Sequence, residues 1–484
     1  MTCGANEEMN TQRPRPNAQR PSASWLAARL LAPALGVGCC SFTMKIVLLT
    51  PGTGSYYCGV CMRDNALAKE LIRQGHDAVM LPMYLPLTLD EGAASPDSEI
   101  FFGGVNVYLQ QKLALFRHTP RWLDRLLNAR GLLNLAARQS GMTATADVGA
   151  LTLSMLQGEH GHQAKELAKL IEWLRGHRPD AVWLSTALLV GLARGIKDAL
   201  GVPVLASLQG EDSFLDGLPE PWRARSWAAM GERAREVDAC IAPSRYYAEL
   251  MGGRMRIAAE KLRVIPNGVA VEETPNAQRP TPNAQPTIGY LARFILGKGL
   301  GLVVEAFILL KKRGRFPTAR LRCAGAMTAD DERYVATLRR KLMDAGLAGD
   351  AEFLPNVSRV EKAAFLHSLT LLSVPASYGE AFGLYLLEAW AAGVPVVQPR
   401  CAAFPELVEA TGGGILCEPD SAEALADGWE TLLAEPAKAR EMGARGRTAV
   451  EREFSLPRMA ERFVALTAEF LKTEIGNSVS SDAR

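Results

Sequence analysis

The sequence lacks the features that would assign it to several large classes of protein. Its 54 Lys and Arg residues against 52 Asp and Glu leave a formal net charge of +2, so no global basic surface indicates a nucleic-acid partner. Nine cysteines are too few and too scattered for a disulfide scaffold, and their odd number fits a reducing compartment. Cys58 and Cys61 form a C-x-x-C pair, but neither a second pair for zinc nor the context of a redox site accompanies it.

Long apolar runs are also missing, since no stretch of about 18 apolar residues is free of charge. Residues 23–42 come closest, but Arg29 interrupts them and no clean cleavage site follows a short apolar core. A signal anchor there is the less favoured alternative. We expect residues 1–43 to be a disordered extension, with Met44 as an alternative start. We expect a cytoplasmic protein, with the inner face of the membrane as an alternative location.

The rest of the chain alternates short apolar runs with helical periodicity. Continuous apolar strands between helices indicate parallel sheets covered on both faces. The expected strands of a first unit are 45–50, 77–83, 180–185, 203–209, 239–244 and 261–268. Those of a second unit are 287–293, 320–326, 351–355, 371–376, 395–400 and 414–419. The fold class is therefore α/β, with two doubly wound sheets and a ligand cleft between the carboxyl ends of their strands.

A segment rich in Pro, Asn and Gln separates the two units. Pro-Asn-Ala-Gln occurs at 16–19 and twice more within 273–287. A segment of this composition has too few apolar side chains to pack against a hydrophobic core. We therefore expect residues 273–287 to be a linker insertion between domains at 44–272 and 288–472. Residues 473–484 are expected to be a disordered tail.

The basic, amphipathic stretch at 117–141 has two interpretations. It could make a peripheral contact with a membrane surface or a lipid acceptor. A solvated helical face that packs on the first domain is the favoured alternative.

The sharpest chemical signal lies in 373–397, SVPASYGEAFGLYLLEAWAAGVPVV. A strand is expected to end at Pro375, and Phe382, Gly383 and Leu384 open a helix. The free N–H groups of a first helical turn bind anions, and a glycine there lets a phosphate approach the backbone. Without further signals, an ordinary helix start would explain the same residues.

Two carboxylates accompany this helix. Glu380 lies in the loop before it, and Glu388 lies two turns further on. Carboxylates aimed at a phosphate would repel it, so these two make sense if they accept hydrogen bonds from neutral hydroxyls of a sugar and a ribose.

Two cations follow the strand at 287–293. Arg293 and Lys298 stand five residues apart at its carboxyl end, where the ligand cleft is expected. An Arg fork and a Lys point charge together suit a diphosphate. A pair of surface cations is the alternative. The Gly-rich loop within 48–81 is a weaker signal, since it has neither G-x-G-x-x-G nor the G-K-[ST] of a P-loop.

These motifs resemble glycosyltransferase family 4, retaining nucleotide-sugar enzymes of the GT-B fold, over residues 44–472. The family's Glu–seven residues–Glu signature is similar to Glu380 and Glu388, and its A-x-G-x-P-V-V is similar to the segment with Gly393 and Pro395.

Shorter motifs extend the resemblance to both units. Arg293 and Lys298 resemble the family's phosphate-binding Arg and Lys, and 266–269 resembles its P-N-G-V. Gly75-His76 resembles the end of its first helix, and counting back places Gly59 on the second glycine of its Gly-Gly loop.

The resemblance implies an N-terminal acceptor domain and a C-terminal donor domain, both Rossmann-like. It implies that Glu380 orients the donor sugar and that Glu388 holds the ribose. The implied catalytic residues are Glu380, Arg293 and Lys298, and the implied donor-binding residues are Phe382, Gly383, Leu384, Glu388 and Gly59.

Two departures from the family pattern concern the first unit. Cys58 replaces the first glycine of the loop, and Gln209 replaces a His that helps to hold the transferred sugar. Gln can still hydrogen-bond a hydroxyl but cannot be a cation, which leaves the donor sugar open. Gln209 and Asp212 are the expected sugar or acceptor contacts.

The expected reaction is sugar transfer from a nucleoside diphosphate sugar to a hydroxyl acceptor. No D-x-D sequence is present, so we expect no metal and no cofactor, with protein cations stabilising the leaving diphosphate instead. Retention without an evident nucleophile implies same-face attack through an oxocarbenium-like ion pair. A sugar-nucleotide-binding protein without turnover is the alternative, and an epimerase or phosphorylase lacks an identifiable residue set. The base is expected near 354–358.

Overall fold

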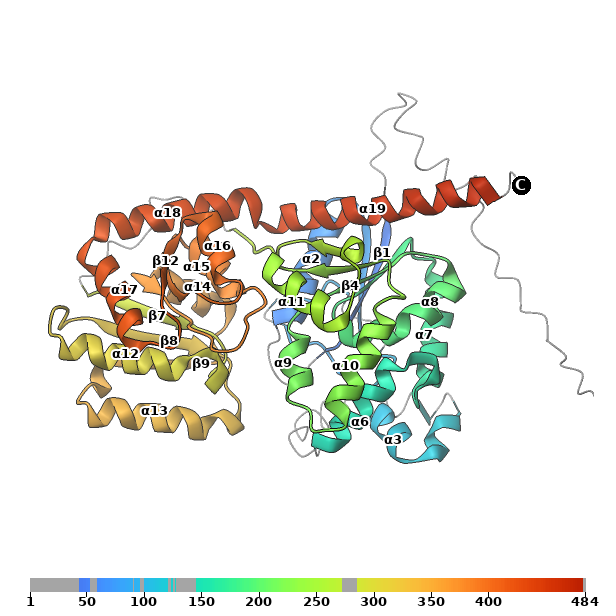
Figure 1. Cartoon of the computed structure of the whole chain (residues 1–484), viewed down its shortest axis with the longest axis horizontal. Helices are drawn as coiled ribbons and strands as arrows, with labels where there is room; N and C mark the ends of the chain where they lie inside the picture. The colour runs from blue at the N-terminus through green and yellow to red at the C-terminus, as the bar shows by residue number, and fades with distance from the viewer. Residues whose placement is uncertain are drawn as a thin grey trace, which may run out of the picture.

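The computed structural model describes residues 43–52, 59–89, 91–95, 100–120, 123–124, 127, 145–271 and 285–481, and of 473–481 it describes the backbone alone. The expectations for residues 1–42 and 272–284, and for most of 117–141, lie outside these residues. Two lobes stand side by side, each built on its own sheet (Figure 1).

The first lobe contains a six-stranded parallel sheet in the order β2-β1-β3-β4-β5-β6. Its strands are β1 (Lys45–Thr50), β2 (Asp77–Pro82), β3 (Ala181–Leu184), β4 (Val204–Ser207), β5 (Ala239–Ala242) and β6 (Leu262–Val264). Val47 and Leu49 pack into one hydrophobic cluster, and Ile46 and Leu48 pack into another. Side chains alternate across a strand, so both faces of this sheet are covered, as the continuous apolar strands predicted.

Helices cover both faces of the first sheet. They are α2 (Gly59–Arg73), α3 (Gly104–Lys112), α6 (Thr145–Leu156), α7 (Ala164–His177), α8 (Ala193–Leu200), α9 (Glu211–Asp216), α10 (Trp222–Arg233) and α11 (Arg245–Met255). Short 3₁₀ turns occupy Ala114–His118, Gly158–His160, Ala187–Leu192 and Ala259–Lys261.

The second lobe repeats the plan with a six-stranded parallel sheet in the order β12-β11-β10-β7-β8-β9. Its strands are β7 (Thr287–Leu291), β8 (Arg320–Gly325), β9 (Ala351–Pro355), β10 (Leu371–Leu372), β11 (Val396–Pro399) and β12 (Gly414–Cys417). The predicted class of two doubly wound, Rossmann-like α/β domains is therefore confirmed. β7 begins at Thr287, where the sequence predicted the first strand of the second unit, so this residue is not part of the linker.

The helices of the second lobe continue to the end of the described chain. They are α12 (Leu300–Lys312), α13 (Glu332–Asp344), α14 (Arg359–His367), α15 (Leu384–Ala391), α16 (Phe404–Thr411), α17 (Ala422–Ala434), α18 (Pro436–Glu453) and α19 (Leu456–Ser481). The 3₁₀ turns are Leu296–Lys298, Ala329–Asp331 and Ala348–Asp350. None of the described helices is long and apolar enough to cross a membrane.

The last helix corrects two predictions about the C-terminal part of the chain. α18 lies along the second lobe, whereas α19 crosses over and lies along the first (Figure 1). Met459, Phe463 and Leu466 of α19 join the hydrophobic cluster of β1, and Phe463 stacks on Trp183 with ring centroids 4.0 Å apart. The second domain therefore does not extend to residue 472. The helical backbone continues to Ser481, where the sequence predicted a disordered tail.

Candidate active site between the two lobes

Lys298 and Glu380 form a largely buried ion pair near the carboxyl ends of the strands of the second sheet. Lys298 ends the 3₁₀ turn after β7, and Glu380 lies in the loop between β10 and α15. The Lys298 Nζ lies 2.6 Å from Glu380 Oε2, and the two side chains are only 18% and 12% exposed. The structure therefore brings together two of the three residues that the sequence identified as catalytic.

Two tyrosines complete this cluster, and sequence reasoning missed both. The Tyr385 hydroxyl donates to Glu380 Oε2 at 3.0 Å, and the Tyr378 hydroxyl approaches the same oxygen at 3.5 Å. Among the described residues no hydrogen bond reaches Glu380 Oε1. The second carboxylate oxygen is therefore the one left to accept from a ligand hydroxyl.

The electrostatics of this cluster keep its donors protonated. Burial lowers the pKa of Lys298, but Glu380 and Tyr378 together more than offset this, so its pKa lies above the usual lysine value. Burial, together with the charge of Glu380, raises the pKa of Tyr378 to about 12, and burial raises that of Tyr385 well above its usual value. The ammonium group and both hydroxyls can thus donate hydrogen bonds at neutral pH.

Arg293, the third predicted catalytic residue, has a different partner. It follows β7 as expected, but its Nη2 lies 3.4 Å from Asp331 Oδ2, and its side chain is 39% exposed. Asp331 also closes the capping box at Thr328, at the start of the α13 region. The guanidinium is therefore tied to the neighbouring βα loop, whereas Lys298 is tied to the Glu380 loop.

The start of α15 has the geometry of an anion site. Gly383 is its N-cap with φ 94°, a conformation that L side chains rarely adopt, and no side chain of the described residues caps this end. The Leu386 N–H donates to the Gly383 carbonyl at 3.0 Å, and the N–H groups of Leu384 and Tyr385 are open to an anion. Phe382 is 2% exposed and packs within the second-domain core, so only its backbone is available to a ligand. Leu384 is half-buried and faces the cleft.

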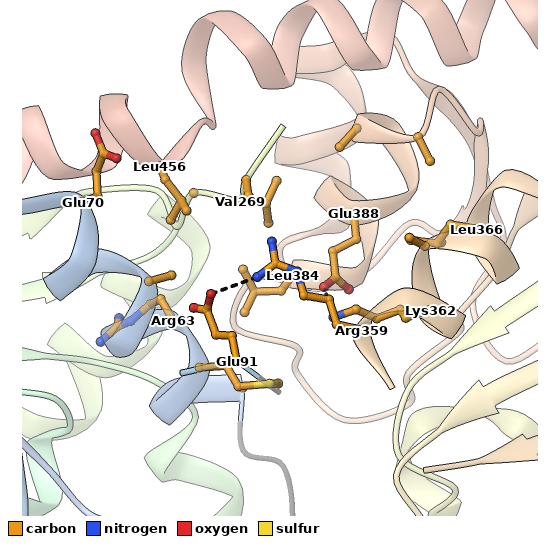
Figure 2. Close-up of a pocket in the computed structure, with 18 of the residues that line it drawn as sticks. Arg63, Glu70, Glu91, Val269, Arg359, Lys362, Leu366, Leu384, Glu388 and Leu456 are labelled. Carbon is orange, nitrogen blue, oxygen red and sulfur yellow. Dashed lines mark hydrogen bonds and ion pairs between the residues drawn. The ribbon is translucent and has the colours of Figure 1, made fainter. Parts of the chain in front are cut away.

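A cavity of about 350 Å³ lies beside this helix, between α2 of the first domain and α14 and α15 of the second. Three of the predicted donor-binding residues, Gly59, Leu384 and Glu388, line it. Glu388 accepts a hydrogen bond from Lys362 Nζ at 2.9 Å (Figure 2). Lys362 was missed because it lies on another helix, where only the tertiary fold could place it.

Two further observations define the walls of the cavity. An ion pair of 2.9 Å between Arg359 Nη1 and Glu91 Oε2 crosses it from the second domain to the first (Figure 2). A Cβ added at Gly59 would lie 3.9 Å from Leu384 Cδ1, an ordinary contact distance. The packing of the described residues therefore does not require glycine there.

The predicted sugar or acceptor contacts lie at the carboxyl end of β4. Asp212 Oδ1 accepts from the Tyr247 hydroxyl at 2.8 Å, and the same hydroxyl oxygen accepts from the Gly210 N–H at 2.8 Å. Burial holds the pKa of Tyr247 well above its usual value, so the hydroxyl remains a donor. The Gln209 N–H donates to the buried Glu211 carboxylate at 2.7 Å. Three hydrogen bonds thus hold this loop, and the Gln209 side chain is half-buried.

The described residues contain no group of three His, Cys, Asp or Glu side chains that could hold a metal ion.

Family models match both halves of the chain. The model described as "Glycosyltransferase Family 4" matches residues 65–273, and the model described as "Glycosyl transferases group 1" matches residues 271–449. Together they extend over both lobes and over every residue discussed in the cleft except Gly59.

Two curated proteins show the range of the similarity. The D-inositol 3-phosphate glycosyltransferase of Pseudarthrobacter chlorophenolicus is 32% identical over 146 residues, which are 30% of this chain and 34% of that protein. A GDP-mannose-dependent alpha-(1-6)-phosphatidylinositol monomannoside mannosyltransferase of Mycobacterium tuberculosis is 27% identical over 317 residues, 61% of this chain and 76% of that protein. The chain thus spans about a third of the first relative and about three quarters of the second.

Solved structures support the fold. Sucrose-phosphate synthase from Thermosynechococcus elongatus has a TM-score of 0.63 at 18% identity, covering 89% of this chain and 100% of that one. HepE of Anabaena, solved with UDP and glucose, has a TM-score of 0.60 at 16% identity, covering 88% and 99%. At this level of identity the two structures show the shared two-domain architecture.

Proposed function

The chain belongs to glycosyltransferase family 4 and has the GT-B fold, and from this premise we propose that it transfers a sugar from a nucleoside diphosphate sugar to a hydroxyl acceptor. The observation that carries the proposal is the contact of Lys298 with Glu380 beside the open first turn of α15. A cation, a helix N-terminus and a carboxylate with one free oxygen suit the diphosphate and the sugar of one donor molecule.

In the proposed reaction the bond between the anomeric carbon and the diphosphate oxygen breaks. Negative charge develops on the leaving diphosphate, where Lys298 and the N–H groups after Gly383 stabilise it. Arg293 adds its positive charge at the same sheet edge, and Asp331 holds its guanidinium in place. Because these groups are fixed before the donor arrives, little reorganisation opposes the charge separation.

The two glutamates have different tasks in this proposal. Glu380 Oε1 accepts a hydroxyl of the donor sugar, while Lys298 and Tyr385 hold Oε2. Glu388 lies in the cavity and accepts the ribose hydroxyls, sharing its charge with Lys362. The sugar is thereby oriented from one end and the nucleoside from the other.

We propose that transfer retains the anomeric configuration. The acceptor oxygen attacks from the face that the diphosphate leaves, through an oxocarbenium-like ion pair, and its proton passes to the departing diphosphate oxygen. The reaction needs no metal in this proposal, because protein cations and the helix N-terminus take over its charge. The acceptor classes that we propose are a glycan, a lipid-linked sugar or a small molecule, in a cytoplasmic biosynthesis of polysaccharide.

The test uses the whole chain and a set of UDP-, GDP- and ADP-sugars. A true donor should raise the melting temperature, because a ligand at about 100 times its Kd stabilises the native state by about 2.7 kcal/mol. The stabilising donor should then release free nucleoside diphosphate in the presence of hydroxyl acceptors or water. If no nucleotide sugar stabilises the protein, the proposal is wrong. Stabilisation without any turnover would instead support a sugar-nucleotide-binding protein.

A further inference from the structure

The Glu380 loop belongs to the second domain in sequence, but it is held by residues of the first. The Ser244 hydroxyl, fully buried at the start of α11, donates to the Ala381 carbonyl at 2.7 Å. Ala381 packs in the hydrophobic cluster of the first domain, whereas Phe382 packs in that of the second. The chain therefore crosses from one core to the other directly after Glu380.

The residue before Glu380 is packed just as closely. A Cβ added at Gly379 would lie 2.4 Å from the Tyr246 hydroxyl oxygen and 3.6 Å from Tyr246 Cζ. Tyr246 lies in the first turn of α11, two residues after Ser244. Both neighbours of Glu380 thus touch the same helical turn across the domain boundary.

A carboxylate of the second domain binds the same turn from the other direction. Glu406, in the first turn of α16, accepts from the N–H groups of Arg245 at 2.9 Å and of Tyr246 at 3.2 Å. A carboxylate is favoured at a helix N-terminus by the unpaired N–H groups and by the helix dipole. This contact forms only when the two domains are closed on each other.

The first turn of α11 also holds the loop that faces the other side of the cleft. Tyr247 receives the Gly210 N–H and donates to Asp212, in the loop of the expected sugar or acceptor contacts. The first turn of α11 therefore contacts both the Glu380 loop, which would bind the donor sugar, and the Gln209–Asp212 loop, which contains the expected sugar or acceptor contacts.

We propose that Ser244, Tyr246 and Glu406 form a closure latch that fixes the Glu380 loop relative to the Gln209–Asp212 loop when the domains close. This inference rests on the proposed function, because it makes the latch a positioning element for the sugar-transfer step. When the domains open, the contacts of Ser244 and Glu406 across the boundary are lost together, and the Glu380 loop loses its support from the first domain. Closure and assembly of the site are then one event.

The experiment compares variants that remove contacts of the latch with a control variant on α16, the helix that contains Glu406. Glu406→Ala and Ser244→Ala each remove a contact across the boundary, whereas Glu409→Ala removes an exposed ion pair of α16 with Arg400. Glu406→Gln keeps an acceptor oxygen without the charge. Each full-length variant is measured for kcat, for the Kd of the free nucleoside diphosphate, and for its radius of gyration in solution with that nucleotide bound.

We expect Glu406→Ala and Ser244→Ala to lower kcat by about tenfold or more, since small displacements of positioned groups carry costs of this order. Nucleotide Kd should change much less than kcat, because Lys298 and Glu388 belong to the second domain and only one wall of the cavity belongs to the first. The radius of gyration should increase. Glu409→Ala should match the wild type on all three measurements, and Glu406→Gln should lie closer to the wild type than Glu406→Ala does.

The latch is wrong if Glu406→Ala and Ser244→Ala behave like Glu409→Ala. It is also wrong if they lose kcat and nucleotide affinity in equal measure, since that result would indicate damage to the second domain itself. If the wild type transfers no sugar, the proposed function fails. The scattering comparison between Glu406→Ala and Glu409→Ala still decides whether the latch holds the domains closed.

Discussion

Replacing Lys298 by Ala should separate two roles of this side chain, one in folding and one in donor binding. Its ammonium lies 2.6 Å from Glu380 Oε2, and the pair is 18% and 12% exposed. Removing one partner of a fully buried pair costs about 3–5 kcal/mol, and an exposed pair contributes about 0–1. Because Tyr385 and Tyr378 still donate to Glu380, we expect Lys298→Ala to lower the free energy of unfolding by about 2 kcal/mol.

The same substitution should weaken binding of the nucleoside diphosphate. A charge-assisted contact with a phosphate oxygen contributes about 1.5–3 kcal/mol, which corresponds to roughly 10- to 150-fold in Kd. Arg293→Ala should also weaken binding and slow transfer. Its effect on stability should be smaller, because its ion pair with Asp331 is longer and more exposed.

The assay is urea unfolding combined with titration of the nucleotide, on the single variants and on Lys298→Ala/Glu380→Gln. The double variant no longer leaves a buried carboxylate without its cation, so its stability should return toward the wild type. Its nucleotide affinity should stay low, since the phosphate contact is still missing. If Lys298→Ala and Arg293→Ala both bind the nucleotide as the wild type does, these residues do not belong to the donor site.

Four further outcomes are expected. Glu380→Gln should lower kcat far more than it weakens nucleotide binding, and Glu388→Gln should do the reverse; steady-state kinetics and titration of each variant would expose an inverted assignment. Transfer should survive EDTA, and activity that is abolished by EDTA and restored by magnesium or manganese would refute the metal-free mechanism. Deleting 275–284 should leave the unfolding temperature of the whole chain unchanged, because loop closure depends only logarithmically on length, and a clear drop would show that the segment is structural. Burial lowers the pKa of Lys298, but Glu380 and Tyr378 together raise it above the usual lysine value, so the side chain loses its charge only at a pH above that value. The kcat/KM profiles of wild type and Lys298→Arg should therefore run parallel between about pH 7 and 9, and an alkaline decline confined to the wild type would contradict the raised pKa.

The sequence by itself determined the two-domain α/β plan. Strands such as Lys45–Thr50 are apolar on both faces, and that pattern occurs only where helices cover a sheet from both sides. The sequence likewise predicted that a helix opens at Phe382, Gly383 and Leu384, and α15 begins at Leu384 with Gly383 as its N-cap. Both features depend on the order of residues within one short segment, so they can be predicted without knowing what that segment packs against.

The tertiary structure decided which of the signalled residues meet. Lys298 and Glu380 are 82 positions apart, and only the neighbouring strands β7 and β10 bring them into contact. Tyr385 gave no separate signal, because a tyrosine in an apolar helix fits a core position equally well.

The last helix is a second case in which the sequence did not determine which parts of the chain pack together. The apolar stripe of α19 predicts that one face of the helix is buried. The spacing of the apolar residues does not indicate which of the two sheets this face packs against. Phe463 stacks on Trp183 of the first domain, so the chain returns to the sheet where it began. Local sequence specifies which faces must be covered, and the partner that covers each face is settled only when all the elements pack together.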